Sequence, residues 1–232
     1  MKNALITGAS GGLGSYICEE YMKRGYRVFG WSNEKNAIID KLEAKYSDLF
    51  VFSIVDLGSY PAVEQAAKEI SVKTEVLDII VNAAAILPAN SALELPEFDI
   101  DISIDVYNIN ALGPLRVVKA LLPIIKKGED KLIIQISSEA ASMATHNNYI
   151  KRYDYCMSKA SLNIQSVILQ RYLKDDGIRI YLVHPGWMKT SMGGEDAPLE
   201  PSESAAHIVG LFDDGKRPDY IFMDYNGTPR PW

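Results

Sequence analysis

Short runs of apolar residues alternate with stretches of helical periodicity along most of the 232-residue chain. Several of these runs are hydrophobic almost throughout, which is typical of strands covered by helices on both faces. The predicted strands are residues 3–6, 27–31, 49–53, 77–82, 131–137, 179–184 and 220–223. The predicted helices are residues 14–24, 34–45, 60–72, 102–125, 154–174 and 203–212. This order predicts one α/β domain over residues 1–232, with a doubly wound, mostly parallel, seven-stranded sheet and helices on both faces.

Two segments interrupt the alternating pattern. Residues 86–101 form a polar stretch with prolines, and residues 188–202 contain two adjacent glycines and two prolines. Both follow predicted strands, and ligands of open parallel sheets bind at the carboxyl ends of the strands. We therefore expect both segments to border one crevice, with residues 188–202 acting as a lid over a substrate.

Composition and charge limit the partners of the protein. The chain is 47% hydrophobic and 23% charged, as in an ordinary globular protein, and its net charge is -6. This charge, without a block of Lys or Arg, argues against a nucleic-acid partner. Cys18 and Cys156 fit neither a disulfide framework nor a metal site, and the three histidines are too scattered for a zinc cluster. We therefore expect no metal.

The start of the chain has no charged and apolar leader, and no apolar run approaches the ~18 residues needed to cross a bilayer. We therefore expect a reduced, cytoplasmic protein that does not enter a membrane.

A glycine-rich segment, residues 7–14, lies between the first predicted strand and the first predicted helix. Glycines at this point let the backbone approach a pyrophosphate, and the helix N-terminus offers unpaired N–H groups to the phosphates. No Gly-Lys-Ser/Thr sequence follows, which excludes a kinase-type phosphate loop. The segment predicts a nucleotide site in a Rossmann-type fold.

Tyr155 and Lys159 lie four residues apart on a predicted helix, so their side chains share one face. A phenol ionises near pH ~10, but a neighbouring ammonium favours the phenolate. The pair can therefore transfer a proton closer to physiological pH. Tyr153 cannot form such a pair, because Met157 occupies its corresponding position.

The spacing of Gly8, Gly12 and Gly14, together with Tyr155-x-x-x-Lys159, resembles the short-chain dehydrogenase/reductase family. The likeness extends along essentially the whole chain. Segments 184–194 and 224–232 are similar to the sniffer and C-factor-like carbonyl reductase branch. Residues 81–84 resemble the family's Asn-Asn-Ala-Gly segment but depart from it at Val81 and Ala84.

The resemblance implies a catalytic set of Ser138, Tyr155, Lys159 and Asn110. Tyr155 would supply the proton, Lys159 would support the phenolate and hold the nicotinamide ribose, and Ser138 would donate to the carbonyl oxygen. Asn110 would anchor a water of the proton relay, although a mid-helix amide ordinarily faces solvent.

The position of the catalytic serine has an alternative. The family places its serine about a dozen residues before the tyrosine, whereas Ser138 lies 17 before Tyr155 and Ser142 lies 13 before it. Ser142 lacks the preceding strand, so we favour Ser138, with the additional residues forming a loop around residues 146–152.

The cofactor is expected to be NADP(H) rather than NAD(H). NAD sites place a carboxylate at the end of the second strand, but this strand ends in Ser32 and Asn33. Ser32, Asn33 and Lys35 could together bind a 2′-phosphate. The expected cofactor contacts are Gly8, Ser10, Gly11, Gly12, Leu13, Gly14, Ser32, Asn33, Asp56, Leu57, Asn82, Ala83, Ala84, Tyr155, Lys159, Pro185, Gly186, Met188 and Thr190.

These residues predict an oxidoreductase that interconverts a small-molecule carbonyl and its alcohol by hydride transfer. The alternatives are a cofactor-binding regulatory or intercellular-signalling protein of the same fold and a nucleotide-sugar epimerase or dehydratase. The resemblance also implies a homodimer or homotetramer. His184 is expected to be structural and Cys156 to be an inert, partly buried thiol. Trp187 could line the pocket or pack against the edge of the sheet.

Overall fold

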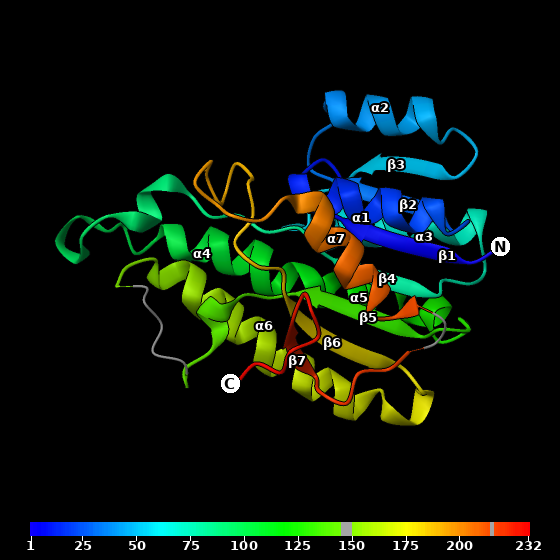
Figure 1. The fold of residues 1–232 in the computed structure, drawn as a ribbon. Coiled ribbons are helices and arrows are strands. Elements are labelled where there is room, and N and C mark those ends of the chain that lie inside the picture. Colours follow the sequence, from blue (N-terminus) through cyan, green and yellow to red (C-terminus); the bar gives the residue numbers. More distant parts are fainter. Residues whose placement is uncertain (145–149, 214–215) are drawn as a thin grey trace.

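A computed structural model describes residues 1–144, 150–213 and 216–232, and its sheet is parallel throughout (Figure 1). The strand order is β3-β2-β1-β4-β5-β6-β7. The strands are β1 (Asn3–Thr7), β2 (Arg27–Ser32), β3 (Phe50–Ile54), β4 (Ile79–Asn82), β5 (Leu132–Ile136), β6 (Arg179–His184) and β7 (Phe222–Asp224). The predicted seven-stranded Rossmann architecture is confirmed.

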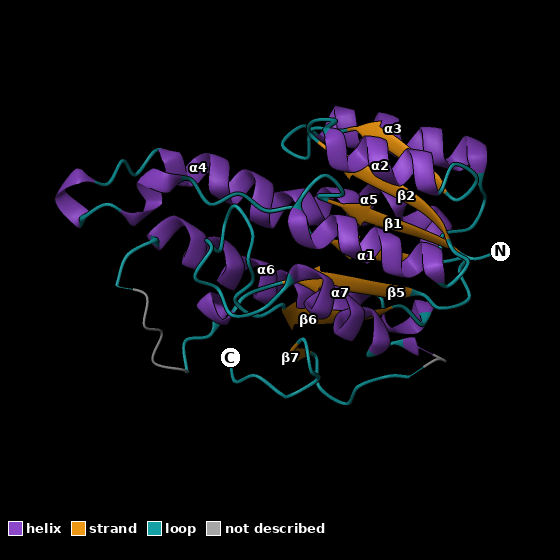
Figure 2. Cartoon of the chain, turned by 45° about the horizontal axis from the view of Figure 1, so that its top comes forward, coloured by secondary structure: helices purple, strands orange, loops and turns teal. Residues whose placement is uncertain are grey.

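Two layers of helices cover the sheet (Figure 2). The helices are α1 (Gly12–Lys23), α2 (Ala37–Lys45), α3 (Tyr60–Lys73), α4 (Ile102–Tyr107), α5 (Gly113–Ile125), α6 (Tyr153–Tyr172) and α7 (Pro201–Gly210). Apolar side chains of α1, α2 and α7 form one core with the sheet, and those of α3 and α5 form a second core on its other face.

The strands have few polar residues because both of their faces are buried. Neighbouring Leu5 and Ile6 belong to different cores, and so do neighbouring Ile133 and Ile134. Successive side chains of a strand point to opposite faces, so each strand supplies both layers at once.

The direction in which successive strands join the sheet reverses next to β1. Strands β2 and β3 lie on one side of β1, and β4 to β7 lie on the other. In such sheets the crevice at this switch point holds the ligand. In Figure 1, segments 86–101 and 188–202 both extend from this end of the sheet, as expected from the sequence.

The predicted helix 102–125 is continuous but contains a π-helical turn at Asn108–Leu112 between α4 and α5. This is the one helix among the described residues that is long and apolar enough to cross a membrane, and half of its apolar window is buried. The helix is nevertheless not an uninterrupted apolar run, because it contains Asp105, Arg116 and Lys119. A core helix passes the same test, because its apolar face packs inside the protein.

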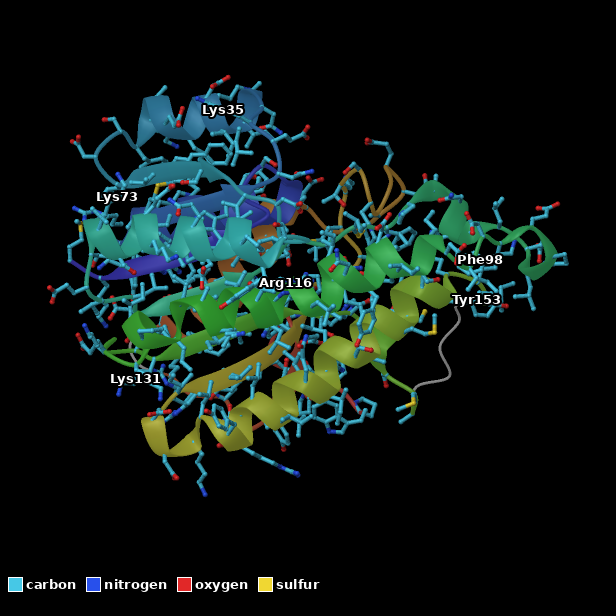
Figure 3. The ribbon with its side chains drawn as sticks, turned by 180° about the vertical axis from the view of Figure 1, so that it is seen from behind. Lys35, Lys73, Phe98, Arg116, Lys131 and Tyr153 are labelled. Carbon is cyan, nitrogen blue, oxygen red and sulfur yellow. The ribbon has the colours of Figure 1, made fainter. Side chains whose placement is uncertain are left out.

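The segment 86–101 is more ordered than a simple loop. It contains 3₁₀ turns at Ala89–Ala92 and Leu95–Glu97. The rings of Phe98 and Tyr153 lie 5.7 Å apart and attach the segment to the start of α6 (Figure 3). In segment 188–202, a β-bridge joins Met188 to Leu199.

Replacing Leu121 by Ala tests the second core. Leu121 is fully buried on α5, so we expect Leu121→Ala to lower the free energy of unfolding by about 3 kcal/mol. Leu115→Ala, on the same helix at 36% exposure, is the control. Urea denaturation followed by circular dichroism measures both variants, and equal losses would contradict the assigned helix face.

Candidate active site

The glycine-rich turn joins β1 to α1, and its shape requires glycine. Gly8 has a φ of +72°, and a Cβ there would lie 2.9 Å from the Ala84 backbone. A Cβ at Gly14 would collide with the carbonyl oxygen of Gly8. α1 begins at Gly12 rather than at the predicted Gly14, so Gly12, Leu13 and Gly14 form its first turn. The first N–H groups of a helix have no intrahelical acceptor and suit a phosphate.

The end of β2 is connected to this turn. The Ser32 hydroxyl accepts a hydrogen bond from the Ser10 backbone N–H at 3.0 Å, and the two hydroxyls lie 2.9 Å apart. Asn33 is exposed beside them. Asn36 caps α2 and also donates to the Ser10 carbonyl at 3.0 Å. The sequence reasoning missed Asn36, although an Asn before a helix is a recognisable capping signal.

Lys35 is less available than the sequence suggested. Its ammonium pairs with Glu43 at 2.6 Å and with Asp40 at 3.2 Å. Both pairs are exposed, so they are weak and exchangeable. Ser32, by contrast, is buried and hydrogen-bonded to Ser10. The binding of a 2′-phosphate by Ser32, Asn33 and Lys35 stays a prediction.

The ends of β3 and β4 border the same crevice. Asp56 is exposed and accepts from the Gly58 N–H at 2.8 Å, whereas Leu57 is buried. The hydroxyl of Thr7 accepts from the N–H groups of Ala83 and Ala84, both at 3.2 Å. This contact fixes the segment after β4 against the glycine-rich turn.

Asn82, at the end of β4, is buried. Its amide donates to the Gln135 side chain at 2.9 Å. The Asn82 side chain is thus directed toward β5 inside the protein.

After β6 the chain returns to the glycine-rich turn. Gly186, after Pro185, has a φ of +82°, a left-handed conformation that favours glycine. A Cβ at Gly12 would lie 2.8 Å from the Thr190 methyl group, and Met188 lies on the same return path. The segment after β6 therefore packs directly against the start of α1. The cofactor contacts expected of Pro185, Gly186, Met188 and Thr190 stay a prediction.

Tyr155 and Lys159 share the inner face of α6, as predicted. They are 8% and 2% exposed, and the Lys159 ammonium lies 5.7 Å from the centre of the Tyr155 ring. Lys159 donates to the Ile136 carbonyl at the end of β5, at 2.8 Å. Burial lowers the pKa of Lys159 to about 8, because an ammonium is less stable away from water.

Asn110 is fully buried in the π-helical turn and does not face solvent. Its amide oxygen accepts from the Ile86 N–H at 2.8 Å, and its amide nitrogen donates to the Ile86 carbonyl at 2.9 Å. The same nitrogen donates to the Ser158 hydroxyl at 3.1 Å. Asn110 thus joins the segment after β4 to α6. The water-anchoring role stays a prediction.

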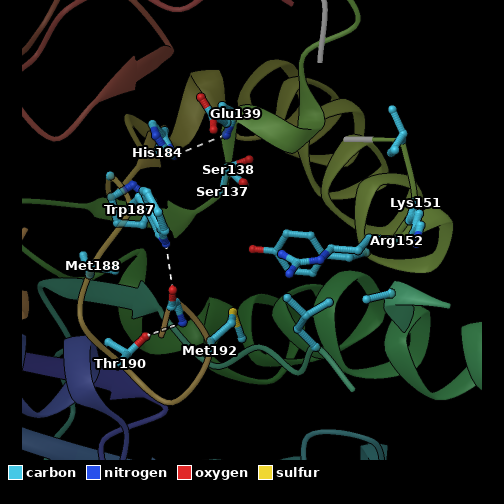
Figure 4. Close-up of a pocket in the computed structure, with 17 residues that line it drawn as sticks. Ser137, Ser138, Glu139, Lys151, Arg152, His184, Trp187, Met188, Thr190 and Met192 are labelled. Carbon is cyan, nitrogen blue, oxygen red and sulfur yellow. Dashed lines mark hydrogen bonds between the residues drawn. The ribbon is translucent and has the colours of Figure 1, made fainter. Parts of the chain in front are cut away.

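Ser138 and Tyr155 line one cavity of about 620 Å³ (Figure 4). The described lining also includes Ser137 but not Ser142. Ser138 is the residue that caps the 3₁₀ turn Glu139–Ala141, accepting from the Ala140 N–H at 3.1 Å. This placement favours Ser138 over Ser142 as the hydroxyl beside the substrate.

His184 and Trp187 form another part of the wall. The Nδ1 of His184 accepts from the Glu139 N–H at 3.2 Å. Burial lowers the pKa of His184, so the neutral ring stabilises the turn that follows Ser138. Trp187 is 56% exposed and donates to the Gly193 carbonyl at 2.7 Å. Trp187 therefore lines the pocket, and its hydrogen bond attaches it to segment 188–202, the predicted lid.

The additional loop after Ser138 lies partly outside the described residues, which omit 145–149. Its described end, Ile150–Arg152, lines the cavity. Arg152, Asp154 and Ser91 were not singled out from the sequence, because no local motif marks them.

Comparison with known proteins agrees with this geometry. Residues 2–200 match the family described as short chain dehydrogenase. The chain belongs to this family. It is 35% identical over 166 residues to "C-signal" of Myxococcus xanthus, covering 70% of this chain and 96% of that protein.

Two solved structures share the fold of this short-chain dehydrogenase. The carbonyl reductase Sniffer of D. melanogaster superimposes with a TM-score of 0.91 at 26% identity, covering 100% of both chains. A putative short-chain dehydrogenase/reductase from Burkholderia multivorans with bound NADP has a TM-score of 0.84 at 28% identity, covering 100% of this chain and 99% of that one. The resemblance to the sniffer and C-factor-like branch is confirmed, and the chain is an NAD(P)-dependent oxidoreductase.

The buried amine makes stability depend on pH. Between the folded pKa of about 8 and the ordinary 10.5 of Lys159, the unfolded chain holds a proton that the folded chain has lost. Stability from this group therefore rises with pH across that window, by at most ~1.4 kcal/mol per pH unit. We expect the cofactor-free Lys159→Met variant to lack this rise. Urea denaturation at several pH values measures it, with Lys174→Met as the control. Parallel curves for native protein and Lys159→Met would contradict the assigned pKa.

Proposed function

We propose that the protein is an NADP(H)-dependent carbonyl reductase in which Tyr155 is the proton donor. The observation that carries this proposal is that Ser138 and Tyr155 line one cavity, with Lys159 buried behind the tyrosine. A reduced nicotinamide, when bound, supplies the hydride for the carbonyl carbon. The chain's own residues then have to place the carbonyl and manage the proton.

The proposed roles follow from the contacts. The Ser138 hydroxyl donates to the carbonyl oxygen as negative charge develops there, and Tyr155 transfers its proton to that oxygen. The cationic form of Lys159 lowers the energy of the phenolate that remains. Asn110 binds both backbone groups of Ile86 and so fixes the segment that carries Leu87 of the cavity wall. The reverse direction uses the same groups, with the phenolate as the base.

A role in cofactor sensing or signalling alone is less well supported, because all four predicted catalytic residues keep buried positions around Tyr155. A nucleotide-sugar epimerase or dehydratase is also less well supported, because the similar solved structures are a carbonyl reductase and a short-chain dehydrogenase/reductase. A small-molecule carbonyl compound fits the cavity of about 620 Å³.

Other features of the proposal concern the setting of the site. Segment 188–202 acts as the lid, since it carries Met192 and Gly193 of the cavity wall. The long helices 102–125 and 153–172 form the contact of a homodimer or homotetramer, and Ile104, Ile164 and Ile168 are exposed on them. The protein works in the cytoplasm, where Cys18 and Cys156 stay reduced.

Replacing Tyr155 by Phe tests the proton donor. Phe keeps the buried ring but lacks the hydroxyl, so we expect the kcat of carbonyl reduction to fall by about a hundredfold or more. NADPH oxidation against a panel of aldehydes and ketones measures it. Ser138→Ala is expected to lose activity and Ser142→Ala to keep it. Full activity of Tyr155→Phe on every substrate that is turned over would refute the assignment.

Introducing a carboxylate at Asn33 tests the cofactor preference. Asn33→Asp places a negative charge beside Ser32, where it repels a 2′-phosphate, so we expect NADPH affinity to fall about tenfold. NADH affinity should change little. Fluorescence titration measures both cofactors, and Gln65→Glu adds the same charge on the exposed face of α3 as a control. Tighter binding of NADH than of NADPH by the native protein would overturn the preference.

A further inference from the structure

Arg152, the residue before α6, has an unfavourable backbone conformation. Its φ is +65°, and Lys131 is the other non-glycine residue of positive φ among those described. A left-handed conformation costs a side-chain-bearing residue roughly 1–2 kcal/mol. Such conformations persist where the surrounding structure enforces them, and they concentrate at functional sites. The conformation of Arg152 therefore indicates that its surroundings hold it in place for a function.

A buried network enforces this conformation. The Arg152 N–H donates to the Ser91 carbonyl at 3.0 Å. The Ser91 hydroxyl donates to the Asp154 carboxylate at 2.5 Å, and the same carboxylate accepts from the Tyr155 N–H at 2.7 Å. Ser91 and Asp154 are 0% and 1% exposed. The backbone of Arg152 is thus fixed between segment 86–101 and the catalytic helix.

The side chain of Arg152 lies in the cavity. It makes no capping hydrogen bond to α6 and lines the cavity together with Tyr155. Figure 4 shows it projecting from the start of α6 into the space opposite Trp187. The strained turn therefore directs a guanidinium to the place where a substrate would meet the proton donor.

Lys151 and Glu139 also lie in the wall, and each of them forms an ion pair. Lys151 pairs with Glu94 at 2.6 Å, and Glu139 pairs with Arg230 at 3.3 Å. The remaining wall near Arg152 is largely apolar and includes Leu87, Ala92, Trp187 and Met192. The site thus combines a cationic end with an apolar and aromatic passage.

We propose that the substrate is an amphipathic aldehyde or ketone with a carboxylate group, and that Arg152 binds this carboxylate. This inference rests on the proposed reductase function and specifies its substrate class. A guanidinium has five N–H donors in a planar fork, so it can hold a carboxylate by two hydrogen bonds while keeping other contacts. The apolar part of the substrate lies against Trp187, and the carbonyl reaches Tyr155 and Ser138.

The experiment compares para-carboxybenzaldehyde with its methyl ester, which has the same reacting group but no charge. In the native protein we expect kcat/KM to favour the carboxylate by at least about tenfold, as a charge-assisted hydrogen bond of ~1.5–3 kcal/mol implies. In Arg152→Gln the carboxylate should fall to the level of the ester, through KM, while the ester changes little. Arg152→Lys should retain part of the preference, because it keeps the charge but not the fork.

Two further variants separate this role from effects on folding or overall charge. Arg152→Asn removes the charge but tolerates the left-handed conformation, so it should fold and behave like Arg152→Gln. Arg171→Gln removes the same charge from an exposed position of α6 and should keep the native preference. Equal kcat/KM for the two aldehydes in the native protein, or a preference that survives in Arg152→Gln and Arg152→Asn, would overturn the proposal.

A binding measurement keeps the two proposals distinguishable. Para-carboxybenzyl alcohol and its methyl ester are titrated calorimetrically into the protein with reduced cofactor present, a combination that cannot react. If neither aldehyde is reduced but the acid binds more tightly than the ester through Arg152, the reductase function fails and the anion site stands. If the ester aldehyde is reduced and the acid has no advantage in turnover or binding, the reductase function stands and the anion site fails.

Discussion

The placement of a charged amine inside the protein is the constraint on which the site depends. Lys159 is 2% exposed and donates to the Ile136 carbonyl at the end of β5. Keeping an ammonium away from water is costly unless it is hydrogen-bonded. The end of a parallel strand supplies a carbonyl that points out of the sheet ladder, and α6 holds the amine against it. The cost of this burial is linked to the proposed chemistry, because a cation close to the Tyr155 ring stabilises a phenolate more in a poorly solvated site than in water.

Buried polar side chains hold the cavity wall formed by segment 86–101 in place. Asn110 binds both backbone groups of Ile86, and Asp154 binds Ser91. Asn110 lies in the π-helical turn at Asn108–Leu112, a feature that is frequent at functional sites, and its amide is buried. Asn110 also donates to Ser158, so segment 86–101 is joined to α6 at two points. The cavity therefore has a rigid wall on this side, and its opposite wall is the return path after β6.

Much of the fold was predictable because its determinants are local. The apolar strands, the glycine-rich turn and the Tyr155–Lys159 spacing are each visible within a few residues. The buried position of Asn110 was not predictable, because helix periodicity does not reveal a π turn. The pairing of Lys35 with Asp40 and Glu43 depends on side-chain geometry, and the strained backbone of Arg152 depends on Ser91, which lies far away in the sequence. Such tertiary contacts override local propensity.

The absence of a side chain at Gly12 couples the first turn of α1 to the segment after β6. A Cβ at this position would lie 2.8 Å from the Thr190 methyl group, so the glycine-rich turn packs directly against the start of segment 188–202. The same segment carries Met192 and Gly193, which line the cavity. A side chain at position 12 would therefore push segment 188–202 outward and displace this wall, so the glycine sets the distance between the turn and the cavity.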